Sequence, residues 1–287
     1  MSNSLSKNLR CVPTAWLVAV FVCLVVVMMT APAHAMKIKD GITYSSGLKL
    51  DVYQPERSGG LFGRKRPVVL YIHGGGWVVG DRKRVYNMPQ WLTSKGYVFV
   101  AIDYRKIPNT TIDGQVRDVT AAIAWTRRNI RRHGGDPNRI VLMGHSAGAH
   151  LSALVAAQGK ASGLRGIIPN DVQAYDLLAY ATKRGSIGAM FGTAFTNEPK
   201  NWIKWSPATY ARKTRRMPPH LILYSRSQGE RRRSISIGYA NLIKGLGTRT
   251  EIFHGTAYSH GAIAARLGRS GDAASKAIER FLDRVTR

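Results

Sequence analysis

Short apolar runs alternate with stretches of helical periodicity along most of the chain. Apolar residues recur at helical spacing in residues 117–132, in residues 147–157 and from Asp272 onward. Strands that alternate with helices through short connections form a mostly parallel sheet with helices on both faces. The pattern therefore predicts a single α/β domain. The runs of strand length are residues 48–53, 67–72, 98–102, 139–143, 164–168, 220–224 and 248–253.

Residues 171–217 interrupt this alternation. Each aromatic ring in the segment is, taken alone, typical of core packing, whereas the group is typical of a substrate pocket. We expect the segment to form a small cap over a site at the edge of the sheet. Its rings belong to Tyr175, Tyr180, Phe191, Phe195, Trp202, Trp205 and Tyr210.

The first 35 residues have the pattern of a secretory signal peptide. Two basic residues precede an unbroken apolar run at residues 15–29, and small residues then suit cleavage after Ala35. An uncleaved anchor is the alternative, but a run of this length, rising about 1.5 Å per residue, is short for a hydrocarbon core of about 30 Å. We expect residues 36–287 to form the mature domain, periplasmic or secreted, with no stable membrane span after cleavage.

Both cysteines, Cys11 and Cys23, lie in that segment, so the mature chain would contain none. Their removal would exclude disulfides, cysteine-ligated metals and a thiol nucleophile. The remaining histidines show no metal-ligand spacing of the H-E-x-x-H kind. We therefore predict neither a metal nor another cofactor.

The mature chain would be strongly basic. Of the 43 Lys and Arg and the 16 Asp and Glu residues, two bases and no acids precede Met36, which leaves a net charge of +25. A solvated surface is one interpretation, and an anionic partner such as an envelope lipid or polysaccharide is the other. Nucleic acid fits less well, because no recognition motif accompanies the charge. The bases cluster at residues 64–66, 82–84, 127–132, 212–216 and 231–233.

Two glycine-rich motifs carry the candidate chemistry. HGGGW, residues 73–77, and GHSAG, residues 144–148, each follow a predicted strand. The second has the G-x-S-x-G form, in which a sharp strand-to-helix turn exposes the serine hydroxyl. A glycine run after a strand is a usual source of backbone N–H donors for an oxyanion. Together they indicate a serine hydrolase with Ser146 as the nucleophile.

With these motifs the sequence resembles the carboxylesterase branch of the α/β-hydrolase superfamily, which includes hormone-sensitive-lipase-like esterases, feruloyl-esterase-like domains and bacterial arylformamidases. The resemblance runs from about Leu48 to the C-terminus. It implies the α/β-hydrolase fold and an acyl-enzyme mechanism. It also implies that the backbone N–H groups of Gly75, Gly76 and Ala147 form the oxyanion hole.

A serine hydroxyl needs a base, which in this fold follows both the nucleophile and the acid along the chain. Three histidines lie beyond the helix that follows Ser146: His220, His254 and His260. The first opens a predicted strand and the second ends one. We predict His260 as the base, because it lies in the loop after the last strand, where a base must reach the serine.

The acid departs from the family pattern. Relatives place an aspartate after the strand that is here residues 220–224, at a position where this chain has Gln228. Glu230 lies two residues later and has a longer side chain, and we predict it as the acid. Asp171, which follows the preceding strand, is the alternative, and a site without a true acid is the third possibility.

These observations predict an exported serine hydrolase that cleaves small-molecule carboxylic esters through Ser146, His260 and Glu230. An arylformamidase-like amide hydrolase is the alternative enzyme, although a cytoplasmic catabolic substrate fits an exported protein poorly. A third hypothesis is a hydrolase-fold protein that has lost efficient catalysis and binds an anionic envelope polymer. Gln228 favours that hypothesis, and the intact glycine motifs oppose it.

Overall fold

The structure is a computed structural model that describes residues 36–56, 64–214 and 216–287, so the predicted signal peptide lies outside the described residues. Their strands form one sheet in the order β1-β2-β4-β3-β5-β6-β7-β8. β2 pairs antiparallel with β1 and β4, and all other pairings are parallel, which confirms the predicted α/β class. The strands are β1 (Met36–Ser45), β2 (Leu48–Pro55), β3 (Arg66–Ile72), β4 (Val98–Ile102), β5 (Gly135–His145), β6 (Gly166–Asn170), β7 (His220–Ser225) and β8 (Thr250–Gly255).

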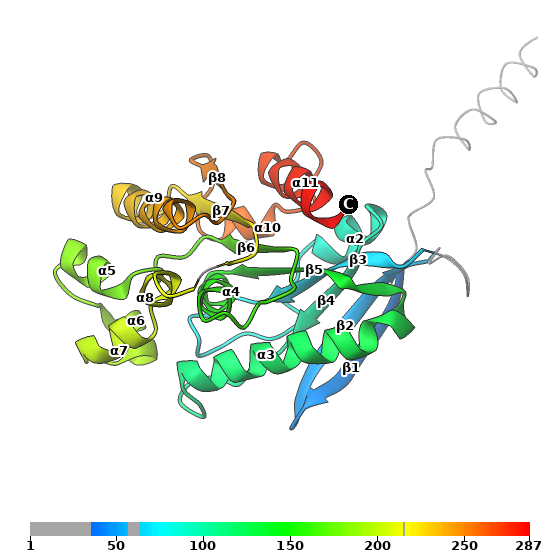
Figure 1. The fold of residues 1–287 in the computed structure, drawn as a ribbon, viewed down its shortest axis with the longest axis horizontal. Helices are drawn as coiled ribbons and strands as arrows, with labels where there is room; N and C mark the ends of the chain where they lie inside the picture. The colour runs from blue at the N-terminus through cyan, green and yellow to red at the C-terminus, as the bar shows by residue number, and fades with distance from the viewer. Residues whose placement is uncertain (1–35, 57–63, 215) are drawn as a thin grey trace, which may run out of the picture. The chain divides into compact units, whose positions relative to one another are not determined.

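Helices lie on both sides of this sheet (Figure 1). None of those in the described part of the chain is both long and apolar enough to span a membrane. The α-helices are α2 (Met88–Ser94), α3 (Ile112–Asn129), α4 (Ala147–Ala157), α5 (Leu177–Arg184), α6 (Ala189–Phe195), α7 (Pro199–Lys204), α8 (Pro207–Ala211), α9 (Gly229–Gly245), α10 (Ala262–Ala265) and α11 (Ala273–Thr286), and the 3₁₀ helix η1 (Ile130–His133) follows α3.

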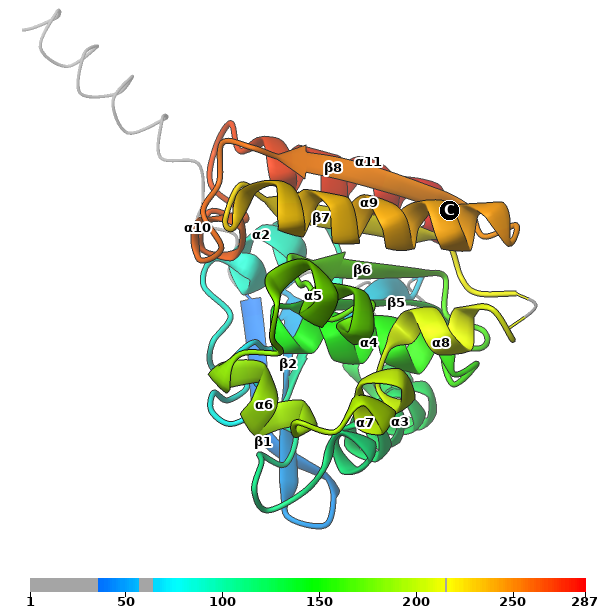
Figure 2. The same cartoon turned by 90° about the vertical axis from the view of Figure 1, so that its left-hand side faces the viewer.

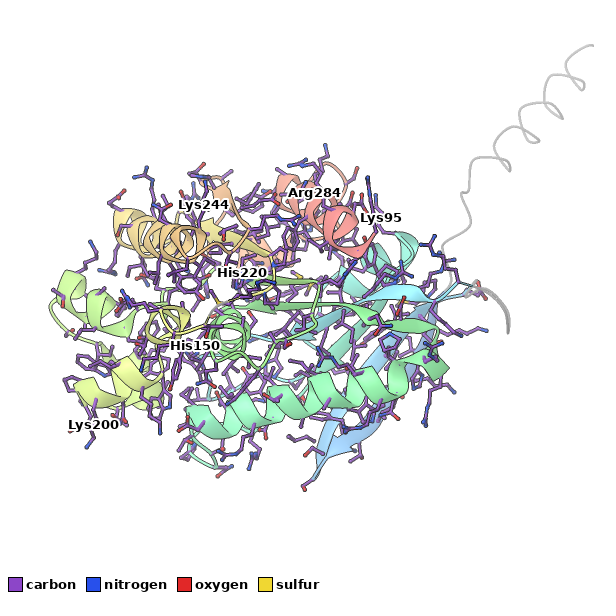
Figure 3. All side chains as sticks on the ribbon, in the orientation of Figure 1. Lys95, His150, Lys200, His220, Lys244 and Arg284 are labelled. Carbon is purple, nitrogen blue, oxygen red and sulfur yellow. The ribbon has the colours of Figure 1, made fainter. Side chains whose placement is uncertain are left out.

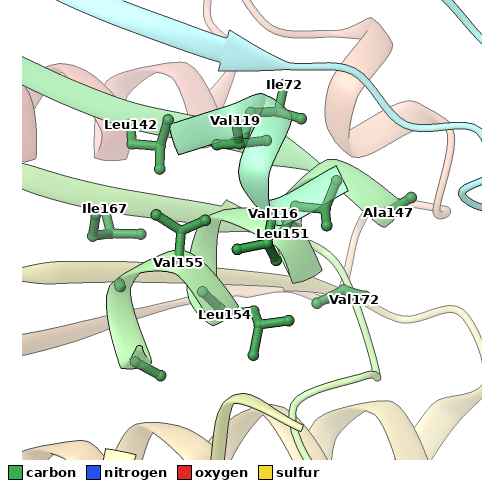
Figure 4. Close-up of a cluster of buried hydrophobic side chains, with 14 of the residues drawn as sticks. Ile72, Val116, Val119, Leu142, Ala147, Leu151, Leu154, Val155, Ile167 and Val172 are labelled. Atoms are coloured by element: carbon green, nitrogen blue, oxygen red, sulfur yellow. The ribbon is translucent and has the colours of Figure 1, made fainter. Parts of the chain in front are cut away.

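Alternate residues of the central strands feed two apolar cores. On β3, Leu70 and Ile72 face the core that contains α3 and α4, whereas Val69 and Tyr71 face the core that contains α2 and α11. Strands buried on both faces read as continuous apolar runs, which is why they could be recognised in the sequence. Figure 4 shows the first core, where side chains of α3 and α4 meet those of β3, β5 and β6.

The helix after Ser146 packs unusually close to the sheet. A Cβ on Gly148 would lie 2.1 Å from the carbonyl oxygen of Ile72, so only glycine permits this approach. Every residue of α4 is buried. The contact fixes the start of α4 beside the end of β3, and with it the position of Ser146.

The predicted cap segment contains α5, α6, α7 and α8, which lie between β6 and β7 in the sequence and group beside α4 (Figures 1 and 2). Phe191 and Phe195 of α6 place their rings 5.4 and 4.7 Å from the ring of Trp77 in the HGGGW loop. Part of the segment therefore packs directly on one of the two glycine motifs.

Candidate active site

Ser146 stands at a sharp turn between β5 and α4. Its backbone has φ +55° and ψ −119°, a conformation that a residue with a side chain rarely adopts. A Cβ on Gly144 would lie 2.2 Å from the carbonyl oxygen of Gly148, so the tight turn requires glycine on the strand side. The local sequence therefore holds the serine hydroxyl out from the carboxyl edge of the sheet.

His260 reaches this hydroxyl from the loop after β8. Its Nε2 lies 3.0 Å from Ser146 Oγ. Two contacts fix the loop: the His260 N–H donates to Ser227 Oγ at 2.7 Å, and His145 Nε2 donates to the His260 carbonyl at 2.9 Å. Burial, followed by the proximity of His260, lowers the pKa of His145 to about 4, so this second ring remains neutral at neutral pH.

Asp171 completes the arrangement. It follows β6, and its Oδ2 accepts a hydrogen bond of 2.7 Å from His260 Nδ1. Because a carboxylate only accepts, this bond places a proton on Nδ1 and leaves Nε2 free to accept the Ser146 hydroxyl proton. Asp171 is the alternative carboxylate that the sequence offered beside Glu230.

The carboxylate of Asp171 is fully buried and is held by several donors. Ser225 donates to it from its backbone N–H at 2.7 Å and from its Oγ at 2.8 Å, and Arg232 lies 2.9 Å from Oδ1. Burial opposes ionisation, but the hydrogen bond from His260 and the charge of Arg232 outweigh it, so the pKa of Asp171 is lower than usual. The group is thus an anion at neutral pH.

The prediction that Glu230 contacts His260 is wrong. Gln228, with φ +61°, is the N-cap residue of α9. Glu230 therefore falls in the first turn of a helix instead of in a loop. Its side chain is 72% exposed and pairs with Arg233 one turn later at 3.0 Å. The acid therefore comes from the end of β6, and β7 contributes the serine that binds it.

The side chain of Gln228 makes its hydrogen bonds with residues other than His260. Its side-chain oxygen accepts hydrogen bonds from Gln173 at 2.9 Å and from Arg231 at 2.7 Å. The resemblance implied an aspartate after β7, where this chain has Gln228. The carboxylate that contacts His260 instead follows β6.

The predicted oxyanion donors lie around Ser146. A Cβ on Gly74 would be 3.1 Å from Ser146 Cβ, so the HGGGW loop passes directly beside the nucleophile. Gly75 and Gly76 have φ of +136° and +58°, a loop shape that favours glycine. Among the described residues, no hydrogen bond engages the N–H groups of Gly75, Gly76 or Ala147.

Two hydrogen bonds through the buried side chain of His150 hold the HGGGW loop. Trp77 Nε1 donates to His150 Nδ1 at 3.2 Å, and His150 Nε2 donates to the Trp205 carbonyl at 2.8 Å. Burial lowers the pKa of His150 to about 4, which keeps the ring neutral and able to accept at one nitrogen and donate at the other. His150 thus links the HGGGW loop to the cap segment.

His73 also helps to hold the HGGGW loop in place. Its Nδ1 donates to the Gly74 carbonyl at 2.6 Å, and its ring stacks on Tyr104 with the centroids 4.4 Å apart. Tyr104 in turn donates to the His73 carbonyl at 3.1 Å. Burial, together with the charge of Lys106, lowers the pKa of His73 to about 4. His73 orients the backbone of the oxyanion loop without contacting Ser146.

The other two candidate histidines, His220 and His254, make their side-chain contacts away from Ser146. His220 lies inside the molecule with His150 (Figure 3), and its Nδ1 donates to the Pro218 carbonyl at 2.7 Å. His254 Nδ1 lies 2.7 Å from Tyr224 Oη. In the described part of the chain, potential metal-ligand atoms come together at His145, Asp171 and His260, within 4.8 Å of one another. The hydrogen bonds given above already engage these three side chains.

The fold and this arrangement define a class of protein. A mostly parallel sheet carries a nucleophile turn after β5, an acid after β6, a histidine after β8 and a glycine loop after β3, all at the carboxyl edge. This is the architecture of the α/β-hydrolases.

Part of the chain is similar in sequence to known esterases. The BD-FAE family model matches residues 50–181. Isoprenylcysteine alpha-carbonyl methylesterase ICME of Arabidopsis thaliana is 36% identical over 118 residues, 41% of this chain and 27% of that protein. Esterase LipQ of Mycobacterium tuberculosis is 43% identical over 95 residues, 33% of this chain and 23% of that protein. The chain thus spans about a quarter of the length of these relatives.

Solved structures give the same fold at greater distance. Esterase B from Lactobacillus rhamnosis has a TM-score of 0.72 at 17% identity, with 95% of this chain and 93% of that chain covered. The Pyrobaculum calidifontis esterase has a TM-score of 0.69 at 22% identity, with 92% and 90% covered. The chain thus has the α/β-hydrolase fold, and over part of its length its sequence is similar to carboxylesterase-type members.

Proposed function

We propose that the protein hydrolyses carboxylic esters through an acyl-enzyme formed on Ser146. The observation that carries the proposal is the hydrogen-bonded row Ser146–His260–Asp171, with 3.0 Å between Oγ and Nε2 and 2.7 Å between Nδ1 and Oδ2. The sequence relatives named as esterases support the same reaction.

In this mechanism Ser146 Oγ attacks the ester carbonyl while His260 Nε2 takes the hydroxyl proton. The tetrahedral oxyanion would accept hydrogen bonds from the backbone of Gly75, Gly76 and Ala147. His260 then gives its proton to the leaving alcohol, and the alcohol departs. A water molecule, deprotonated by the same nitrogen, then attacks the acyl carbonyl. The bond from the acyl carbon to Ser146 Oγ breaks, Oγ takes the proton back from His260, and the carboxylic acid leaves. Asp171 holds the ring and stabilises its cation throughout.

We propose that the substrate is a small ester whose acyl group lies near the HGGGW loop and α6. Met190 of α6 is an exposed apolar side chain, and its Sδ would lie 3.7 Å from a Cβ on Gly76. Phe191 and Phe195 pack behind it against Trp77. Apolar side chains of this kind suit a short acyl chain better than a charged one.

The nucleophile is tested with the Ser146→Ala variant. We expect it to lose hydrolysis of 4-nitrophenyl acetate and butyrate and all labelling by a fluorophosphonate probe, because only an activated serine reacts with that probe. The matched control is Ser162→Ala, which removes a hydroxyl from an exposed loop serine. Wild-type turnover by Ser146→Ala, with the fold confirmed by circular dichroism, would refute the mechanism.

A further inference from the structure

An arginine lies buried against the acid of the site. Arg232 is the middle one of three consecutive arginines, and it is only 4% exposed. Its place follows from helix periodicity, because it falls on the buried face of α9 with Ile235, Tyr239 and Ile243. Burying a guanidinium is costly unless a charge and hydrogen bonds compensate for it.

The guanidinium is held at both of its ends. Its NH1 lies 2.9 Å from Asp171 Oδ1 and donates to the Asp171 carbonyl at 3.2 Å. Its Nε donates to the Ser227 carbonyl at 2.8 Å. A planar fork can reach these acceptors together, whereas a single ammonium group cannot. The contacts fix Arg232 between the end of β6 and the loop that follows β7.

The end of β7 and the loop that follows it hold the carboxylate of Asp171, although neither of them supplies a carboxylate to His260. Ser225 gives Asp171 two hydrogen bonds, and Ser227 accepts both from the His260 N–H and from Arg232. Where the relatives have an aspartate after β7, this chain has donors that hold an aspartate from β6. Arg232 is the one charged member of this set.

We propose that Arg232 is a positioning residue that fixes Asp171 for its hydrogen bond with His260. The proposal rests on the function proposed above. Asp171 is left with Oδ2 for the histidine because Arg232 engages Oδ1. Without Arg232 the buried carboxylate keeps its bonds to Ser225 but loses its charged partner.

Arg232 also lies against the histidine. Its NH1 is 3.4 Å from His260 Nδ1, and the proton on Nδ1 is directed to Asp171. One guanidinium thus contacts both members of the pair whose geometry it fixes.

The test compares Arg232→Met with Arg233→Met, a matched change one residue along the same helix at an exposed position. For Arg232→Met we expect kcat to fall by up to about 100-fold, the cost of misplacing a reacting group by about 1 Å. We expect KM to change little, because the contact that Arg232 supports is needed chiefly in the transition state. Arg233→Met should change neither kcat nor KM. An Arg232→Met enzyme with wild-type kcat, or with a change in KM alone, would overturn the proposal.

Arg232→Lys decides the matter if Arg232→Met does not fold. Lysine keeps the charge but lacks the planar fork, so we expect kcat to fall with KM little changed, and a wild-type kcat would overturn the proposal. A wild-type protein that neither hydrolyses esters nor labels would instead contradict the proposed function. The crystal structure of an Arg232 variant would then decide, because an unmoved Asp171–His260 contact would overturn the positioning role.

Discussion

At the scale of single residues, the acid shows what spacing along a chain can and cannot determine. Ser146 and His260 could be chosen because a motif or the order of strands restricts each to one position. The acid has two positions in this fold, one after β6 and one after β7, and only the folded chain shows which carboxylate meets the histidine. Asp171 lies 2.7 Å from His260 Nδ1, whereas Glu230 points to solvent.

We predict that Asp171→Asn lowers kcat by about 10⁴-fold, the loss seen when a triad acid becomes an amide and the histidine takes the wrong tautomer. KM should change little, because the charge is needed chiefly in the transition state. The matched control is Glu230→Gln, which removes an exposed carboxylate and should leave kcat within about twofold of wild type. Steady-state kinetics on 4-nitrophenyl butyrate measure both variants, and a silent Asp171→Asn would reassign the acid.

The lowered pKa of Asp171 also fixes the direction of the acid response. Because the carboxylate stays ionised as the pH falls from neutral into the mildly acidic range, protonation of Asp171 is not what first ends activity. Any loss of kcat through protonation of this carboxylate should therefore appear only below its usual titration range, which a pH profile of kcat measures.

At the scale of elements, the strands that carry the site could be predicted from the sequence, whereas two elements at the surface, β1 and α9, could not. β4 and α4 have the predicted bounds, and β7 differs from its prediction by one residue. β1 was not foreseen, because its exposed residues show no apolar pattern and it gains its hydrogen bonds only by pairing with β2. α9 was not foreseen, because an arginine and a serine interrupt its buried face.

The HGGGW loop gives the prediction at this scale. A Cβ on Gly75 would lie 2.0 Å from the Val79 carbonyl oxygen, and the N–H groups of Val78 and Val79 both bond to the Gly75 carbonyl. Gly75→Ala must therefore displace the loop and move the donors of Gly75 and Gly76 away from the oxyanion. We expect kcat to fall by about 10²- to 10³-fold, the effect of losing one such donor, with KM little changed.

The control for this variant is Gly159→Ala. Gly159 also has a positive φ, of +72°, but nothing lies within 4 Å of its added Cβ and it is remote from the loop in the sequence. It also places an alanine at a positive φ, but without the displacement of the loop. Equal losses of kcat in the two variants would attribute the effect to strain and remove the support for these oxyanion donors.

At the scale of the whole molecule, the positive charge is spread over surface helices as well as loops. Lys95, Lys200, Lys244 and Arg284 lie at the outer surface (Figure 3). One concentration occurs at a cavity of about 480 Å³ beside the amino ends of β3 and the end of α11. The site lies at the opposite, carboxyl edge of the strands, so a partner bound at this cavity would leave Ser146 accessible. The basic side chains that line the cavity are Arg64, Lys65, Arg66, Arg139 and Arg287.

We propose that the protein is exported and associates with an anionic envelope surface through this charge. Expressed from its full sequence in a Gram-negative host, the protein should appear in the envelope fraction with Met36 as its first residue. It should be released by 1 M salt, because the Debye length falls from about 10 Å at 0.1 M to about 3 Å. Recovery from the cytosol with Met1 retained would contradict export, and retention at 1 M salt would contradict an electrostatic association.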